Sequence, residues 1–180
     1  MRIARWILFA LVAALPLAGC IVTSGQFLIS VDLLDGNPVP VTNPDVIALP
    51  VDLTTDETYN DYKENLESIA DVALLGEVTN VGANAASIEF YMTRDLTTYL
   101  TASQVLADPT VVRVWGVLTA APGETKRINW DDSAGLFAGR QALLEEVKGD
   151  GQFTLYGIGT SGATATISDG VLVLVVDAGM

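Results

Sequence analysis

Short runs in which apolar and polar residues alternate recur along the whole chain. In residues 26–34, Phe27, Ile29 and Val31 occupy every second position. Alternation places every second side chain on one face of a β-strand, so that face can be buried while the other meets water. We therefore predict a mainly β protein, an antiparallel β-sandwich of about seven or eight short strands. The other runs of this kind cover residues 72–81, 87–93, 110–118, 126–130, 153–158 and 163–176.

Turn-forming residues between these runs predict that strands adjacent in the sequence pair with each other. Gly82-Ala83-Asn84 follows residues 72–81, which predicts a hairpin with residues 87–93. Ser161-Gly162 predicts a second hairpin at the end of the chain.

The segment between the first two strands is rich in proline and glycine. We predict a long loop within the domain at residues 35–50. Pro50 interrupts the apolar residues 46–53 and cannot donate to a ladder of hydrogen bonds, so this stretch is at best an edge strand.

Two segments change to the period of a helix. Tyr59, Tyr62, Leu66 and Ile69 follow one another at steps of three or four, which predicts an amphipathic helix over residues 55–71. A second helix is predicted from Asp132 or Ser133 through Leu136, Leu143, Leu144 and Val147, and residues 101–106 predict a short helical turn. Two inserted helices are too few for a parallel α/β sheet, which needs one between most strands.

The first twenty residues have the pattern of a secretory signal. Arg2 and Arg5 precede the apolar residues 6–15, a run too short to span a bilayer. The segment ends in Leu17-Ala18-Gly19-Cys20, which resembles the lipobox of bacterial lipoproteins at all four positions. The resemblance implies cleavage between Gly19 and Cys20, with diacylglycerol on the Cys20 thiol and an acyl group on its new amino terminus. Acyl chains add about 0.8 kcal/mol of membrane affinity per buried methylene.

This resemblance implies an organisation for the whole chain. Residues 1–19 would be the signal peptide, residues 20–25 a lipidated tether, and residues 26–180 a single β-sandwich domain. Ile21 stands where an aspartate would signal retention in the inner membrane, so we expect the cell envelope and, within it, the outer membrane. The body itself, over residues 72–93, resembles the immunoglobulin-type sandwiches of desiccation-related, WHy-like domains, although Asn43-Pro44 lacks the aromatic residue that follows in that family.

Composition excludes several functions. The chain has no histidine and one cysteine, so a histidine-based triad, a histidine-ligated metal and an internal disulfide are all excluded. Its net charge is −13, and residues 1–19 contain two arginines and no acidic residue, so cleavage would lower the charge to −15. Such a charge disfavours nucleic acid, which is bound by clustered lysine and arginine. We expect membrane contact through the lipid alone, and no metal or other cofactor.

Two kinds of acidic sequence are candidates for catalysis or for metal binding. Asp131-Asp132 and Glu145-Glu146 offer the paired carboxylates of glycoside hydrolysis, but they also suit the start of a helix and a solvated helix face. Asp35-Gly36-Asn37 and Asp56-Glu57 with Asp61 offer oxygens to calcium, but the first also reads as a turn and Asp56 as a helix cap.

Aromatic residues and the missing catalytic motifs complete the prediction. Trp115, Trp130, Tyr91 and Tyr156, with Tyr99, are candidate ligand contacts, although on strands such residues are usually core. No Ser-x-x-Lys or Gly-x-Ser-x-Gly motif is present. We expect a non-enzymatic structural, assembly or binding accessory with an envelope protein partner, recruited by strand addition at a sheet edge. The alternatives are a carrier with an apolar cavity of about 300 Å³ or more, and a carbohydrate-acting enzyme using the paired acids.

One further stretch bears on a partner. Residues 171–176 are unbroken apolar, so we expect them to be buried on both faces or covered by a partner.

Overall fold

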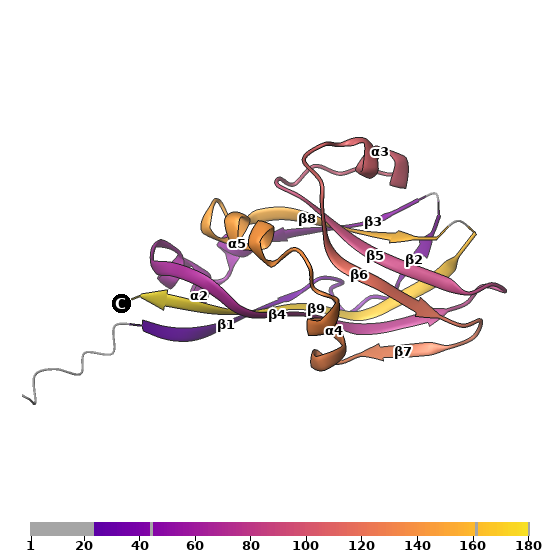
Figure 1. Ribbon diagram of the computed structural model, residues 1–180, viewed down its shortest axis with the longest axis horizontal. Coiled ribbons are helices and arrows are strands. Elements are labelled where there is room, and N and C mark those ends of the chain that lie inside the picture. Colours follow the sequence, from indigo (N-terminus) through magenta and orange to yellow (C-terminus); the bar gives the residue numbers. More distant parts are fainter. Residues whose placement is uncertain (1–23, 44, 161, 180) are drawn as a thin grey trace, which may run out of the picture.

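Two antiparallel sheets pack face to face, which confirms the predicted mainly β sandwich. The computed structural model describes residues 24–43, 45–160 and 162–179. In Figure 1 the four-stranded sheet, ordered β3-β8-β5-β6, lies above the five-stranded sheet, ordered β1-β9-β4-β7 with β2 also paired to β9. The described strands are β1 (Ser24–Asp32), β2 (Val39–Thr42), β3 (Ile47–Asp52), β4 (Leu66–Asn80), β5 (Ala86–Thr93), β6 (Val112–Ala120), β7 (Thr125–Ile128), β8 (Gln152–Gly159) and β9 (Thr164–Gly179).

Strands adjacent in the sequence mostly belong to different sheets, so both predicted hairpins are wrong. β4 pairs with β9 and β7, whereas β5 pairs with β6 and β8. The last two strands likewise separate, with β8 in the four-stranded sheet and β9 in the five-stranded one. Alternation identifies which face of a strand is buried but not which strand lies beside it. The segments that contain these turn-forming residues carry the chain from one sheet to the other.

The core lies between the sheets and is organised around β9. Leu172, Leu174 and Val176 of β9 point inward and are fully buried. Opposite them, Phe90 of β5 meets the indole of Trp115 edge to face, with ring centroids 5.6 Å apart.

The first predicted helix is much shorter than expected. The α-helix α2 covers only Glu57–Tyr62, a 3-10 turn follows at Lys63–Asn65, and β4 begins at Leu66. The pairing of β4 with β9 is irregular between Leu66 and Ser68 and again between Ile69 and Asp71. Each bulge adds a residue to the strand, so inward residues fall three apart and imitate the spacing of a helix.

The second predicted helix is two helices. α4 covers Trp130–Leu136 and α5 covers Arg140–Lys148, and Asn129 rather than Asp132 or Ser133 caps the first of them. Between them the chain is extended against β6, and the N–H groups of Ala138 and Gly139 both donate to the Val114 carbonyl, at 3.0 and 3.2 Å. A Cβ at Gly139 would lie 2.7 Å from the Val114 Cα, so this approach requires glycine.

The remaining local predictions are partly confirmed. The predicted helical turn is α3 (Ala102–Ala107), which begins with a capping box at Thr101 and Gln104. β3 is an edge strand with an exposed Pro50, as expected. Residues 35–50 are not one loop, because β2 and the start of β3 lie within them. A 3-10 turn, Leu53–Thr55, follows β3.

Side chains from the helices protect the open edge of β4. β7 pairs only with residues 76–79 of β4, so the earlier part of that edge has no strand beside it among the described residues. There the buried Ser133 hydroxyl accepts the Leu74 N–H at 2.7 Å, and the Arg140 guanidinium donates to the Ala70 carbonyl at 3.4 Å. Lys148 donates to the Glu67 carbonyl, also at 3.4 Å. These bonds block strand addition along this part of the edge.

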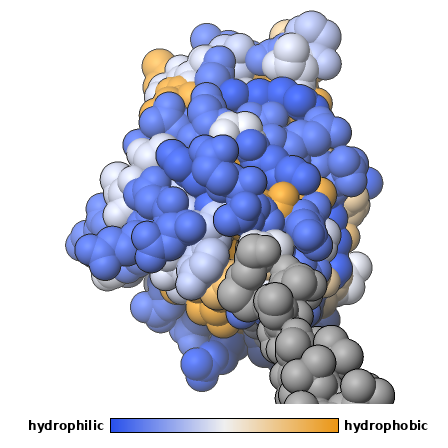
Figure 2. All heavy atoms as spheres, turned by 90° about the vertical axis from the view of Figure 1, so that its left-hand side faces the viewer, coloured by the Kyte–Doolittle hydropathy of each residue, from blue (hydrophilic) through white to orange (hydrophobic). Residues whose placement is uncertain are grey.

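One end of the sandwich holds the start of β1, α2 and the end of β9. Phe27 of β1 stacks on Tyr62 of α2 with ring centroids 3.6 Å apart, which closes this end of the core. The surface here is mainly hydrophilic (Figure 2), and it includes the exposed Glu57, Asp61 and Glu64. None of the described helices is long and apolar enough to cross a membrane. The predicted signal peptide, Gly19, Cys20 and Ile21 lie outside the described residues.

Candidate protein-binding groove

A groove of about 590 Å³ runs between β6 and β7, the outermost strands of the two sheets on one side of the sandwich. α4 closes one end of it. Eight residues line it: Val117, Leu118, Thr119, Lys126, Arg127, Ile128, Asp132 and Leu136. We call this the β6–β7 groove.

The groove exists because both strands lack an outer neighbour. At the start of β6 the chain supplies one itself, since Trp115 forms an isolated antiparallel bridge with Phe137. Beyond that bridge β6 pairs only with β5, and β7 pairs only with β4, among the described residues. Val117 on the open part of β6 remains 45% exposed. Unpaired strand edges beside exposed apolar side chains are the usual template for adding a strand.

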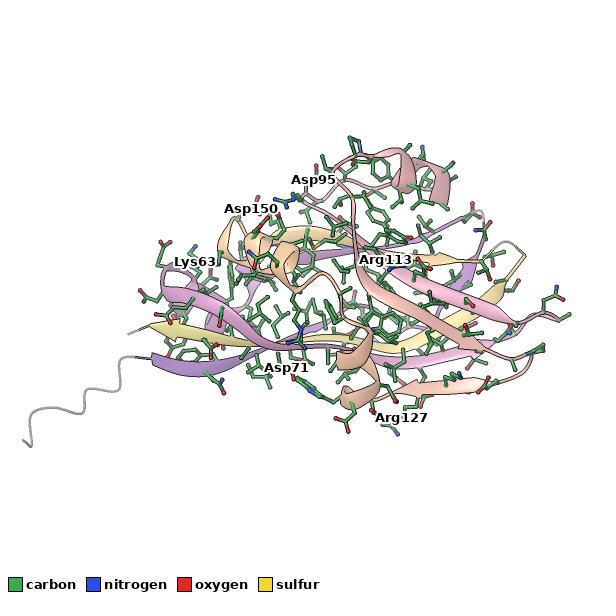
Figure 3. The ribbon with its side chains drawn as sticks, in the orientation of Figure 1. Lys63, Asp71, Asp95, Arg113, Arg127 and Asp150 are labelled. Atoms are coloured by element: carbon green, nitrogen blue, oxygen red, sulfur yellow. The ribbon has the colours of Figure 1, made fainter. Side chains whose placement is uncertain are left out.

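Two basic side chains border the groove in an otherwise acidic protein. Lys126 and Arg127 are consecutive on β7, and Lys126 approaches Glu124 only at 3.9 Å. Arg127 is exposed and has no carboxylate within 4.0 Å in the part of the chain that the structure describes, and Figure 3 shows it pointing away from the body. The other described arginines are each paired, Arg94 with Glu145, Arg113 with Glu89 and Arg140 with Asp71.

The predicted aromatic ligand contacts do not share a surface. Trp115 is fully buried between the sheets, and its Nε1–H donates to Ser133 Oγ at 3.2 Å. Tyr156 is also fully buried, and its hydroxyl donates to the Thr97 carbonyl and accepts the Tyr99 N–H. These two residues hold the core and the loop after β5 in place, so they are not ligand contacts.

The other two candidates are half-buried and lie on different elements, Tyr91 on β5 and Trp130 in α4. Tyr91 on β5 donates to Glu89 at 2.7 Å, and burial together with that carboxylate raises the pKa of Tyr91 to about 12. Trp130 begins α4, and its Nε1–H donates to Asp71 at 2.9 Å. A shallow hollow of about 310 Å³ beside Trp130 is lined by Leu75, Gly76, Glu77, Arg127, Ile128, Asn129 and Asp169.

The paired acids are separated into two environments. Asp131 and Asp132 are exposed in the first turn of α4, as expected for residues that stabilise a helix start. Glu145 and Glu146 on α5 both contact Arg94, at 2.7 and 3.4 Å. Asp132 is the one carboxylate among the residues that line the β6–β7 groove. The groove therefore does not bring together the two carboxylates that glycoside hydrolysis requires.

Arg94 acts differently on its two partners. Hydrogen bonds from Arg94 and Gln141 hold the pKa of the Glu145 carboxyl below its usual value. Glu146 is only 8% exposed, and burial raises its pKa although Arg94 opposes the shift. A carboxyl whose pKa is raised by folding destabilises the folded state once it is charged, so its cost appears as the pH rises through that pKa.

We expect Glu146→Gln to have a free energy of unfolding equal to that of the wild type at neutral pH or higher by up to about 1 kcal/mol. The difference should shrink as the pH falls below the raised pKa of Glu146. Glu145→Gln is the matched control and should have the opposite effect. Because folding lowers the pKa of Glu145, its charged form stabilises the fold when the pH is above the pKa that this carboxyl has in the unfolded chain, and that stabilisation is lost in acid. Thermal melts from about pH 7 to about pH 4 measure both; a Glu146→Gln variant that is less stable at neutral pH would contradict the assignment.

The calcium candidates have structural roles. Asp35 and Gly36 form a turn with φ angles of 50° and 71°, and the Asp56 carboxylate caps α2 by accepting the Tyr59 N–H at 2.8 Å. Within residues 24–43, 45–160 and 162–179, no three histidine, cysteine, aspartate or glutamate side chains are grouped to hold a metal.

A void between the two sheets is too small for a ligand. A void lined by Leu33, Leu34, Leu49, Leu74, Leu75, Gly76, Val78, Phe90, Ile128, Ile167 and Gly170 measures about 10 Å³. That is the size of a single water site, far below the roughly 300 Å³ that a small apolar ligand occupies. This part of the interior therefore does not support the carrier alternative.

The unbroken apolar residues 171–176 of β9 are buried on the inner face of the sheet and only partly covered on its outer face. On the outer face, Val173 is buried while Val171 and Val175 are half-buried. Their neighbour Leu28, paired with Val175, is exposed.

No family model matches this chain, and no curated protein matches it. Among solved structures, it is similar to a latent aurone synthase (polyphenol oxidase), with 14% identity and a TM-score of 0.40 over 81% of this chain and 27% of that one. The chain thus spans about a quarter of the length of that enzyme. It is also similar to a chain of turnip yellow mosaic virus, with 8% identity and a TM-score of 0.28, covering 87% of this chain and 82% of that one.

Proposed function

We propose that this chain is a lipid-anchored protein of the bacterial cell envelope that acts without catalysis, through contact with a protein partner. The lipobox at residues 17–20 supports the anchor. The observation that supports the contact is the β6–β7 groove, where two strand edges and the exposed Val117 lie open together. Two other edges are protected, β3 by Pro50 and the early part of β4 by Ser133 and Arg140. β1 is also an edge strand, since it pairs only with β9 among the described residues, but no groove of this kind lies beside it in the second sheet.

A lipid on Cys20 would hold the body close to the membrane. Only four peptide units separate Cys20 from Ser24, the first residue of β1, so the tether reaches at most about 14 Å. The end of the sandwich that would face the lipid is hydrophilic and carries the exposed Glu57, Asp61 and Glu64 (Figure 2). Such a surface is repelled by anionic head groups, so in this proposal the acyl chains alone make the membrane contact.

The predicted membrane can be tested by one substitution. Ile21→Asp creates the retention signal described above, so we expect it to move the protein from the outer to the inner membrane fraction. Ile21→Val is the matched control and should leave the distribution unchanged. Separation of the two membranes by density, followed by immunoblotting, measures both; equal distributions of Ile21→Asp and wild type would remove the argument for the outer membrane.

The protein contact can be tested in the same membranes. A photo-crosslinking amino acid at Val117, in the groove, should yield a defined cross-linked species. The same amino acid at Val81, which is 60% exposed at the end of β4 and outside the groove, is the control. Equal yields from both positions, or none from Val117, would contradict a contact at the groove.

A further inference from the structure

We infer that the β6–β7 groove binds an extended segment in which apolar and acidic residues alternate, added antiparallel to the open part of β6. This inference rests on the proposed role in protein contact and names the partner's chemistry. It concerns residues beyond the Trp115–Phe137 bridge, where β6 has no outer neighbour among the described residues.

The chain itself shows that this edge accepts a strand. Phe137 pairs with Trp115 in the antiparallel sense, and the next two N–H groups, of Ala138 and Gly139, bond to the Val114 carbonyl. α4, which ends at Leu136, turns the chain away from β6 at this point. Leu136 still lies against Gly116, where a Cβ would meet the Leu136 carbonyl oxygen at 3.3 Å. A bound segment would therefore occupy the edge that this internal pairing leaves free, from Val117 to Thr119.

The apolar lining selects one face of the bound segment. Leu118 of β6, Ile128 of β7 and Leu136 of α4 line the groove from three elements. Because successive side chains of a strand point to opposite faces, a bound strand would direct every second side chain toward these residues. An aliphatic side chain at those positions would bury apolar area on both partners.

The charged residues of the groove favour acidic side chains on the other face of the bound segment. Lys126 and Arg127 on β7 and Asp132 on α4 are the charged residues that line the groove, so its lining has a net charge of +1. Arg127 has no ion-pair partner in the described part of the chain. A second copy of this protein is disfavoured as the occupant, because two bodies that each have a net charge of −13 before any cleavage repel each other over their whole facing surfaces, whereas a short segment meets mainly the charges that line the groove. Acidic side chains on a foreign segment would pair with the two cations at the solvated rim, which mainly sets specificity and the rate of association.

The full chain can be tested with an octapeptide in which valine and glutamate alternate. We expect it to bind, to slow hydrogen exchange of those amides of residues 117–119 that face the open edge rather than β5, and to lose about tenfold in affinity with Arg127→Glu. Lys63→Glu is the matched control, because it makes the same change in charge outside the groove and should alter affinity less than about twofold. A valine–lysine octapeptide should bind the wild type more weakly than the acidic one and recover affinity in Arg127→Glu.

Several results would overturn this inference. These are no binding of the acidic peptide, equal effects of Arg127→Glu and Lys63→Glu, or protection of amides elsewhere. Concentration-dependent dimerisation by light scattering that Arg127→Glu abolishes would instead identify a second copy as the occupant. If the peptide fails while Val117 still cross-links in the membrane, the contact role survives and only the partner's chemistry is wrong; if both fail, the proposed contact falls as well.

Discussion

Gly151→Ala is expected to lower the free energy of unfolding by about 3–5 kcal/mol. Gly151 follows α5 with a φ of +76°, a conformation that costs alanine about 1–2 kcal/mol. A Cβ there would also lie 2.5 Å from the hydroxyl oxygen of Tyr59. Tyr59 is buried and donates to the Val147 carbonyl at 3.0 Å, so it cannot move aside without losing that bond and its packing.

Gly162→Ala separates the cost of the positive φ from the cost of the contact with Tyr59. Gly162 has the same φ of +76°, but a Cβ there would meet no heavy atom within 4 Å. Its substitution should cost only the conformational part, about 1–2 kcal/mol. Urea denaturation of both variants measures the difference. Equal losses would mean that Tyr59 does not pack against Gly151 as described.

Ser133→Ala is expected to lower the free energy of unfolding by about 2–4 kcal/mol. The Ser133 hydroxyl is fully buried and accepts two N–H groups, from the Leu74 backbone and the Trp115 indole. Alanine would leave both donors without a partner in the core, at about 1–3 kcal/mol each, and part of this is recovered by local adjustment. The loss should also expose the β4 edge, because this hydroxyl stands where a neighbouring strand would be.

Ser30→Ala provides the comparison. Ser30 is exposed on β1, and its substitution should change stability by less than about 0.5 kcal/mol. Trp115 reports on the site directly, since its indole is bonded to Ser133 and its emission should shift when that bond is lost. A Ser133→Ala variant as stable as Ser30→Ala, with unchanged emission, would show that the two bonds are not formed.

Features that depend on local chemistry could be predicted from the sequence. The alternation in residues 26–34 identifies the inward residues of β1, because side-chain direction in a strand is fixed by position. Pro50 correctly predicts an edge strand, because a proline has no N–H to donate to a neighbouring strand whatever the rest of the fold. Strand pairing could not be predicted from local sequence, because β9 takes its neighbours β1 and β4 from distant parts of the chain.

The candidate groove could not be predicted, because its walls come from different sheets. Val117 and Leu118 belong to β6, and Arg127 and Ile128 to β7, which pair with different strands. The one local signal was the adjacent Lys126 and Arg127 on a short strand of an acidic chain. The aromatic candidates illustrate the converse difficulty, since only packing reveals that Trp115 and Tyr156 are buried.

The intact mass of the protein extracted from membranes tests the central claim, the lipid anchor at Cys20, most directly. We expect a wild-type chain that begins at Cys20 and carries the added mass of diacylglycerol and an acyl group. Cys20→Ala should lack both the cleavage and the added mass. A mature wild-type chain that is unmodified, or cleaved at another position, would contradict the anchor and leave a secreted domain whose contacts must be explained without a membrane.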